Sequence, residues 1–112
     1  MAITIKQIAS GAINNSVSSF TDLTTAVADG KAQIIKNMRF YNTSSSASIT
    51  LTLAFYLGTG ADKIIAKVNM DPETVYIEND EITMEKDHKI RYKTGTTGGP
   101  IDFVVSGIQR DV

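Results

Sequence analysis

Hydrophobic and polar residues alternate along much of this chain, most regularly in the segment Ile49–Leu57. There every odd-numbered position carries a large apolar side chain, and the even-numbered positions carry Thr, Thr, Ala and Tyr. Successive side chains of a β-strand point to opposite faces of its sheet, so this pattern places the five large residues on one face. A helix would distribute the same residues around its circumference. The segment is therefore predicted to be a half-buried strand.

Less regular alternation predicts further strands along the rest of the chain. They lie at Ala32–Asn42, Lys63–Met70, Thr74–Glu78, Glu81–Glu85, His88–Thr94 and Pro100–Ile108, with one more at Ile3, Ile5 and Gln7. The residues expected to share the apolar faces of these strands are Ile34, Met38, Phe40, Ile64, Ala66, Val68, Met70, Val75, Ile77, Ile82, Met84, Ile90, Tyr92, Ile101, Phe103 and Val105. Lys36 interrupts the apolar face of its strand, which indicates a β-bulge or a sheet edge at that point.

Turn-forming residues separate the predicted strands. They occur at Asp29-Gly30, Thr43–Ser46, Gly58–Asp62, Asp71–Glu73 and Thr94–Pro100. Short strands at this spacing predict an all-β fold, an antiparallel β-sandwich of about seven to nine strands, for which a jelly roll and a barrel are alternative topologies. One stretch, Phe20–Ala28, has the features of a helical turn, because Ser19 or Thr21 can act as its N-cap.

The chain divides into two unequal parts. Its 112 residues are the length of one domain, and we place the β-sandwich in residues 22–112. Residues 1–21 contain one short strand followed by Ser10–Ser19, the least patterned stretch of the sequence. We predict that this N-terminal strand is an arm that pairs either with its own sheet or with a neighbouring subunit in an oligomer.

The composition excludes several classes of function. The chain has no cysteine and one histidine, which excludes disulfide scaffolds, thiolate zinc sites, cysteine nucleophiles and multi-histidine metal sites. Eleven basic residues against twelve acidic ones give a formal charge of -1, which argues against a nucleic-acid or membrane partner. No secretory signal peptide and no membrane span is recognisable, so we expect synthesis in the cytoplasm.

Three features of the sequence are candidate sites of chemistry. His88 lies between charged residues near the start of a strand, without a Gly-x-Ser-x-Gly nucleophile, and is expected to be a solvated turn residue. The acidic stretch Asp71–Asp87 does not match a calcium-loop spacing and is expected to be a solvated face. Gly58–Lys63 lacks the Gly-Lys-Ser/Thr ending of a phosphate loop and is expected to be a hairpin loop. We therefore predict no enzymatic activity and no cofactor.

Charged and apolar residues in two regions are candidates for a protein interface. A basic run carries Lys89, Arg91 and Lys93, and with Lys36 and Arg39 it is expected to form a positive patch. This positive patch would complement the acidic stretch Asp71–Asp87 of a neighbouring subunit, and patches of opposite charge set the orientation of subunits in an assembly. These residues are therefore predicted to contact protein rather than nucleic acid. Ile3 and Ile5 of the N-terminal strand are predicted to belong to the same kind of interface.

Part of the sequence resembles a group of small virion-associated proteins of tailed bacteriophages. The resemblance begins with a Gly-Lys turn, an Ile-rich strand and an Asn-Thr-Ser loop in Gly30–Ser44, before the Thr/Leu strand Ser48–Leu57. It continues through the turn Pro72–Val75, in which the group's glycine is absent, the hairpin Glu81–Arg91 and the closing strand Phe103–Ile108. It covers approximately residues 22–109 and leaves out the N-terminal arm.

The resemblance implies a role in a virion. Comparable β-sandwiches of tailed phages decorate capsids, join heads to tails, or form parts of tails and fibres. We therefore expect a homo-oligomeric structural protein of the virion that docks onto the capsid or tail and contacts other virion proteins. The alternative is a carbohydrate- or host-receptor-binding module, in which the tyrosines Tyr41, Tyr56, Tyr76 and Tyr92 stack on a host-surface glycan.

Overall fold

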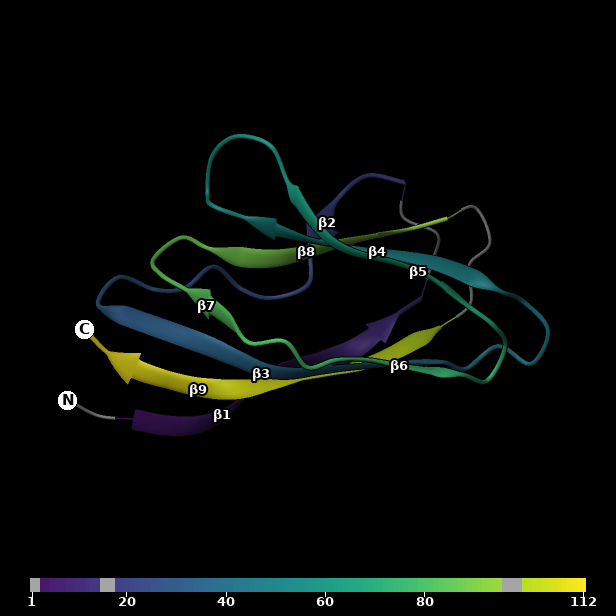
Figure 1. Cartoon of the computed structure of the whole chain (residues 1–112), viewed down its shortest axis with the longest axis horizontal. Coiled ribbons are helices and arrows are strands. Elements are labelled where there is room, and N and C mark those ends of the chain that lie inside the picture. The colour runs from purple at the N-terminus through teal and green to yellow at the C-terminus, as the bar shows by residue number, and fades with distance from the viewer. Residues whose placement is uncertain (1–2, 15–17, 96–99) are drawn as a thin grey trace.

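The computed structural model describes residues 3–14, 18–95 and 100–112, in which nine strands form two antiparallel sheets (Figure 1). The strands are β1 (Ile3–Ile13), β2 (Thr21–Asp22), β3 (Lys31–Asn42), β4 (Ile49–Tyr56), β5 (Lys63–Met70), β6 (Val75–Glu78), β7 (Ile82–Met84), β8 (Lys89–Thr94) and β9 (Ile101–Asp111). The described residues contain no helix, and therefore none that is long and apolar enough to cross a membrane. The predicted all-β sandwich is confirmed.

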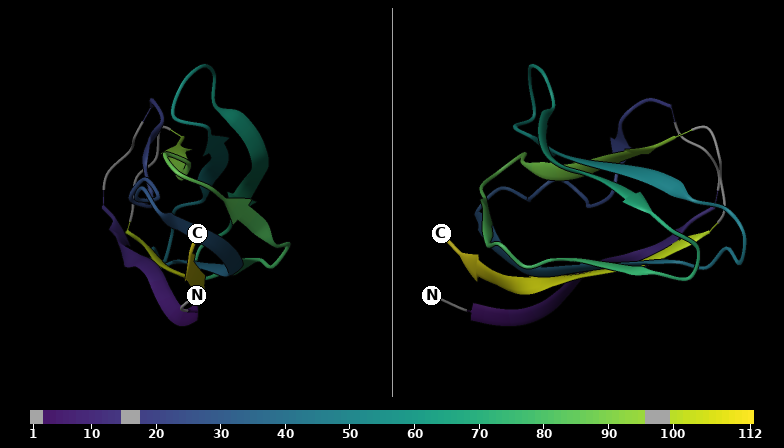
Figure 2. Two further views of the ribbon diagram at one scale, coloured as in Figure 1. Left: turned by 90° about the vertical axis from the view of Figure 1, so that its left-hand side faces the viewer. Right: turned by 45° about the vertical axis from the view of Figure 1, so that its right-hand side comes forward.

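The strand order is that of a jelly roll. One sheet, here called sheet A, has the order β1-β9-β3-β6, with β7 pairing beside β6 along the same strand β3. The other, sheet B, has the order β2-β8-β4-β5 and lies across the core from sheet A (Figure 2). If β6 and β7 are counted as one interrupted strand, eight strands pair first with last, second with seventh, third with sixth, and fourth with fifth. This nested pairing is a long hairpin rolled into two sheets.

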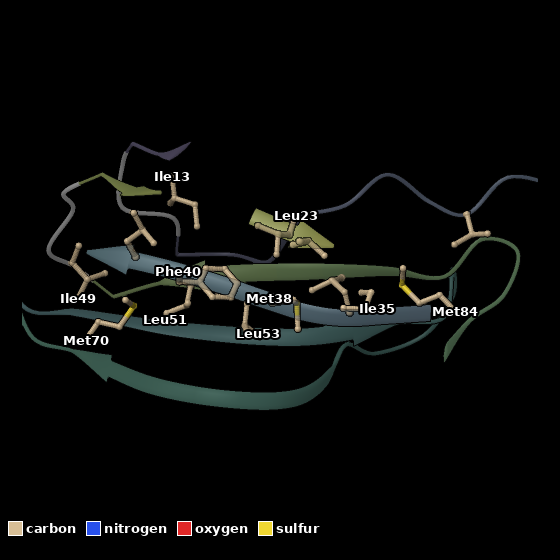
Figure 3. Close-up of a cluster of buried hydrophobic side chains, with 14 residues drawn as sticks. Ile13, Leu23, Ile35, Met38, Phe40, Ile49, Leu51, Leu53, Met70 and Met84 are labelled. Atoms are coloured by element: carbon tan, nitrogen blue, oxygen red, sulfur yellow. The ribbon is translucent and has the colours of Figure 1, made fainter. Parts of the chain in front are cut away.

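The core lies between the two sheets and is built from the alternation seen in the sequence. Ile49, Leu51 and Leu53 of β4 face Met38 and Phe40 of β3, and all five side chains are almost fully buried (Figure 3). The same core includes further residues that the pattern assigned to it: Met70, Met84, Ile90, Ile101 and Val105. The period of two therefore identified most of the core side chains.

Four predicted core-facing residues are instead exposed. Leu57 lies beyond the end of β4 and is 43% exposed, and Ile64 is 61% exposed because the β4–β5 register shifts between Leu53 and Ala54. Val75 and Ile77 are each 45% exposed on the outer face of sheet A. Between them Tyr76 takes the core side, where its ring stacks on Phe40 with 6.3 Å between centroids. The prediction was wrong in β6 because all three residues are apolar or aromatic, and either face was compatible.

The predicted helical turn at 20–28 is also wrong. Thr21–Asp22 form the short strand β2, and the residues after it run along the end of β8. The backbone N–H groups of Leu23 and Thr24 both donate to the carbonyl of Ile90, and the Thr24 hydroxyl accepts from the N–H of Ile90. Strand β8 thus supplies the hydrogen bonds that a helix would make internally, so tertiary pairing overrides the local capping signal.

The N-terminal strand pairs with its own sheet. β1 runs antiparallel to β9 from Ile3 opposite Arg110 to Ile13 opposite Ile101, with an irregularity between Gln7 and Ala9. It is longer than the sequence pattern indicated, because part of the unpatterned stretch Ser10–Ser19 continues the strand. Ile13 lies in the core. The division at residue 21 and a role of this arm in oligomer contacts stay predictions.

Lys36 marks a bulge, as one of the two sequence interpretations proposed. The β3–β9 register shifts between Ile35 and Asn37, and Lys36 is the extra residue there. On β9 the bulge faces Gly107, where an added Cβ would lie 2.0 Å from the backbone oxygen of Ile34. The two strands approach so closely at this point that a residue with a side chain does not fit without a backbone shift.

A buried side-chain amide, that of Asn42, joins the two sheets at the C-terminal end of β3. The Asn42 side chain, at the end of β3, is fully buried. Its Nδ2 donates to the carbonyl oxygens of Ala47, Met70 and Asp71 at 2.9 to 3.2 Å, and its Oδ1 accepts from the N–H of Ser44. One side chain thereby supplies partners for backbone groups of two connections, which would otherwise be buried without hydrogen bonds.

Gly107→Ala is expected to lower the free energy of unfolding by about 2 kcal/mol or more, the scale of a forced backbone shift in a packed site. The control is Gly95→Ala, where the new Cβ would meet Thr50 at an ordinary 3.5 Å. Chemical denaturation of both variants measures the effect as a shift in midpoint at constant slope. Equal midpoints for the two variants would contradict the close approach.

Candidate interaction surfaces

The basic residues of β8 are engaged by partners within their own chain. Arg91 lies on the outer face of sheet B, where its guanidinium carbon is 3.9 Å from the centre of the Tyr56 ring. Its Nε lies 3.2 Å from Asp22 Oδ1, and its Nη1 lies 3.5 Å from Asp62 Oδ2. Lys89 Nζ lies 2.9 Å from the other oxygen of Asp22. These charges are neutralised locally rather than presented to a partner.

Asp22 is the acceptor that Lys89 and Arg91 share. Burial alone would raise the pKa of its carboxyl group, but hydrogen bonds and opposite charges from Lys89 and Arg91 outweigh that effect and hold the pKa below its ordinary value of 3.8. The ionised carboxylate thereby connects the two-residue strand β2 to β8 by side chains as well as by backbone bonds.

The single positive patch expected from the sequence does not form. Lys89, Arg91 and Lys93 lie on the outer face of sheet B, whereas Lys36 and Arg39 belong to β3 in sheet A. Lys93 Nζ lies 4.8 Å from the centre of the Phe20 ring, and Lys36 pairs with Glu81. The prediction was wrong because it grouped residues by charge, whereas β3 and β8 belong to different sheets. A role of any of the five in a protein interface stays a prediction.

Exposed apolar side chains gather on the outer face of sheet A. Val75 lies directly opposite Tyr41, and Ile77 lies opposite Arg39, whose other neighbour is Val104. Tyr41, Val75, Ile77 and Val104 are 37 to 45% exposed. We call these four residues and Arg39 the outer-face patch. Among the described residues no carboxylate forms an ion pair with Arg39, in contrast to Arg91 on the other sheet.

Sequence reasoning missed this patch. The sequence pattern assigns Val75 and Ile77 to the core and does not include Val104 on the apolar face of its strand. The available signal was the triplet Val-Tyr-Ile itself, since a strand that is apolar on both faces either is buried on both or presents one face to a partner.

Ile3 and Ile5 lie on β1, at the edge of sheet A. They are 66% and 90% exposed, and Ile5 stands opposite Ile108, which in turn stands opposite Ile34 of β3. Both predicted N-terminal interface residues therefore present apolar surface at a sheet edge. Whether they contact a partner stays a prediction.

No site of chemistry is assembled from the other predicted candidates. The described residues contain no group of three His, Asp or Glu side chains placed to hold a metal ion. His88 closes its own turn, with Nδ1 accepting from the N–H of Glu85, and its ring meets the Phe55 ring edge-on at 5.2 Å. Gly58–Asp62 connects β4 to β5 as a hairpin loop. The connection predicted at Thr94–Pro100 lies partly outside the described residues.

The four tyrosines do not form one stacking platform. Tyr41 belongs to the outer-face patch on sheet A, and Tyr56 lies beneath Arg91 on sheet B. Tyr92 packs against the core. Tyr76 also packs on the core and donates from its hydroxyl to Glu78 Oε2 at 2.8 Å; burial and this carboxylate, with Asp80, raise its pKa to about 12.

One hollow of about 260 Å³ opens where the ends of β3, β7 and β9 meet. Basic side chains of Lys31, Lys86 and Arg110 contribute to its lining, together with acidic side chains of Asp29 and Glu85. Lys31 pairs with Asp111, and Lys86 lies 4.0 Å from Asp29. The lining of the hollow therefore mixes charges of both signs, and two of its three basic side chains have acidic neighbours.

The sequence matches no protein-family model and no curated protein. Its fold is similar to that of a chain in the crystal structure of the T13 particle of infectious bursal disease virus, with a TM-score of 0.61 and 10% identity over 97% of this chain and 31% of that one. A chain of the Gx strain of this virus gives a TM-score of 0.55 and 12% identity over 96% and 32%. The protein thus shares its β-sandwich fold with viral-particle chains, of which it spans about a third.

Asp22→Asn is expected to lower the free energy of unfolding at neutral pH by about 0.5 to 1 kcal/mol, the range of exposed ion pairs. Because the folded-state pKa of Asp22 is depressed, its contribution is present above the unfolded pKa of about 4 and is lost as the pH falls through the folded pKa. Denaturation curves of wild type and variant should therefore converge below about pH 3.

Asp29→Asn is the matched control, because the Asp29 side chain is 87% exposed and its lysine is 4.0 Å away. Its curves should follow those of the wild type at every pH. If Asp22→Asn were as stable as wild type at neutral pH, the proposed connection between β2 and β8 would be wrong.

Proposed function

We propose that this chain is a structural protein of a virus particle, and in particular a homo-oligomeric virion component of a tailed bacteriophage that docks onto the capsid or tail. The outer-face patch carries the proposal. A sheet face that presents four large apolar side chains around an arginine is typical of a surface that another protein covers.

The composition of the patch supports a protein partner. Aromatic residues and arginine are enriched at protein interfaces, and both are present as Tyr41 and Arg39. An arginine without an ion-pair partner among the described residues is available for a carboxylate on the other protein. On sheet B, by contrast, Arg91 and Lys89 are already paired. Sheet A is therefore the favoured contact surface.

Two further observations agree with a virion role. The fold is shared with chains of a viral particle, and the sequence resembles phage virion proteins over residues 22–109. Neither observation supplies a position in the particle, so head, neck and tail are distinguished by experiment. The glycan-binding alternative has less support, because Tyr56, Tyr76 and Tyr92 are engaged within the fold.

The test is made on particles produced from the genome that encodes this chain. Mass spectrometry of purified particles should find the protein, and its copy number relative to the major shell protein separates a shell component with many copies from a tail component with few. Absence from particles, despite expression in the producing cells, would overturn the proposal.

Introducing charge into the outer-face patch is expected to remove the protein from particles. Ile77→Asp and Val104→Asp each place a carboxylate in the centre of the proposed contact, and each should reduce copies per particle by at least about tenfold, the scale of an unpaired interface charge. Ile64→Asp is the control, since the Ile64 side chain is also exposed, at 61%, but lies on β5 in sheet B. Equal incorporation of all three variants would show that sheet A is not the docking face.

A further inference from the structure

The free edge of β1 is the least protected strand edge among the described residues. β1 ends sheet A, and along its eleven residues the only charged side chain is Lys6. Residues 3–7 and 10–12 are exposed. The backbone groups of β1 that point away from β9 have no strand beside them, and such a row of donors and acceptors is a template for another strand.

The other edges carry the devices that discourage pairing. β6 and β7 are four and three residues long; β6 ends with Glu78, and Asp80 and Glu81 lie between the two strands. β2 has two residues. β5 carries exposed Lys63 and Lys67 within eight residues. Short edges and edge lysines are the usual protection against strand addition. In β1, by comparison, the eleven described residues carry one exposed lysine, Lys6, and one irregularity, between Gln7 and Ala9.

We propose that β1 pairs antiparallel with β1 of a second copy of this chain across a two-fold axis, so that the two A sheets become one continuous sheet. A second copy is the favoured occupant because it presents the same nearly neutral strand, and one two-fold contact removes both free edges at once. Lys6, the one charged residue of β1, gives too little charge to select an acidic partner. In the antiparallel pair, Lys6 lies opposite Lys6 of the second copy in only one of the possible strand registers.

The size of this contact is adequate for a stable dimer. Eleven residues of strand span about 36 Å, and complete pairing would form about ten backbone hydrogen bonds, the number typical of specific interfaces. Ile3 and Ile5 of each copy add apolar contact beside the new pair. This inference deepens the homo-oligomeric part of the proposed function, and it uses a different surface from the outer-face patch.

The first test is the oligomeric state of the purified full-length chain. Analytical ultracentrifugation over the micromolar range should show a monomer–dimer equilibrium. Ile5→Lys should raise the dissociation constant at least about tenfold, because it adds a charge to each edge of the pair. Ile64→Lys on β5 is the matched control and should leave the dissociation constant unchanged. Both side chains are mostly exposed, so at concentrations at which the wild type is monomeric both variants should keep its unfolding midpoint.

The second test locates the axis. The chain has no cysteine, so single substitutions Thr4→Cys, Gln7→Cys, Ser10→Cys and Ala12→Cys each give one spin label per copy. In an antiparallel β1 pair the distance between equivalent labels should pass through a minimum within β1 and increase by about 7 Å per residue on either side. Asn69→Cys on β5 should give a long distance.

The outcomes separate this inference from the proposed function. The inference would be overturned if the wild type were strictly monomeric. It would also be overturned if Ile5→Lys left the dimer dissociation constant unchanged, or if the label distances had no minimum within β1. None of these results bears on whether the protein is found in particles. Conversely, a β1-paired dimer that is absent from purified particles would retain the inference and overturn the virion role.

Discussion

The pairing of β3 with β9 is the constraint on which the rest of the structure depends. It runs from Lys31 opposite Asp111 to Asn42 opposite Ile101, and every other strand of sheet A pairs with one of these two. The register of the pair shifts at the Lys36 bulge, and the close approach beside it needs Gly107, since a Cβ there would meet the backbone oxygen of Ile34. A single glycine on one strand and an extra residue on the other therefore keep the two central strands of sheet A in register on both sides of the bulge.

The nested topology determines where the unpaired edges of the sheets lie. Rolling a long hairpin into two sheets gives each strand a partner from the opposite half of the chain, so the first strand pairs with the last. This leaves β1 and β6–β7 at the edges of sheet A, and β2 and β5 at the edges of sheet B. Of these edges only β1 is long and nearly uncharged. The order of the strands along the chain thus places β1 at an edge, and the few charged residues of β1 leave that edge available for the addition of another strand.

The sequence predicted the strands well, because burial of one face imposes a period of two that is visible without long-range information. For the same reason it indicated either a bulge or a sheet edge at Lys36, since a lysine on an apolar face is costly unless the register shifts or the strand is exposed. It could not predict that Tyr76, rather than Val75 and Ile77, faces Phe40, because all three are compatible with a core. Nor could it predict that Leu23 and Thr24 bond to Ile90, or that Lys36 and Lys89 lie in different sheets. Both facts depend on contacts between distant parts of the chain.

The near-neutral charge of the chain has a structural explanation that bears on recognition. On sheet B, Asp22 and Asp62 pair with Lys89 and Arg91 of β8, and Lys36, Lys31 and Lys86 have acidic neighbours of their own. Ion pairs within the molecule therefore account for part of the charge balance, and such paired charges exert little field on a partner at physiological ionic strength. What sheet A presents outward is apolar area around Arg39 and the free backbone groups of β1. Recognition through such groups depends on shape and strand register, which are properties suited to a repeated subunit in an ordered assembly.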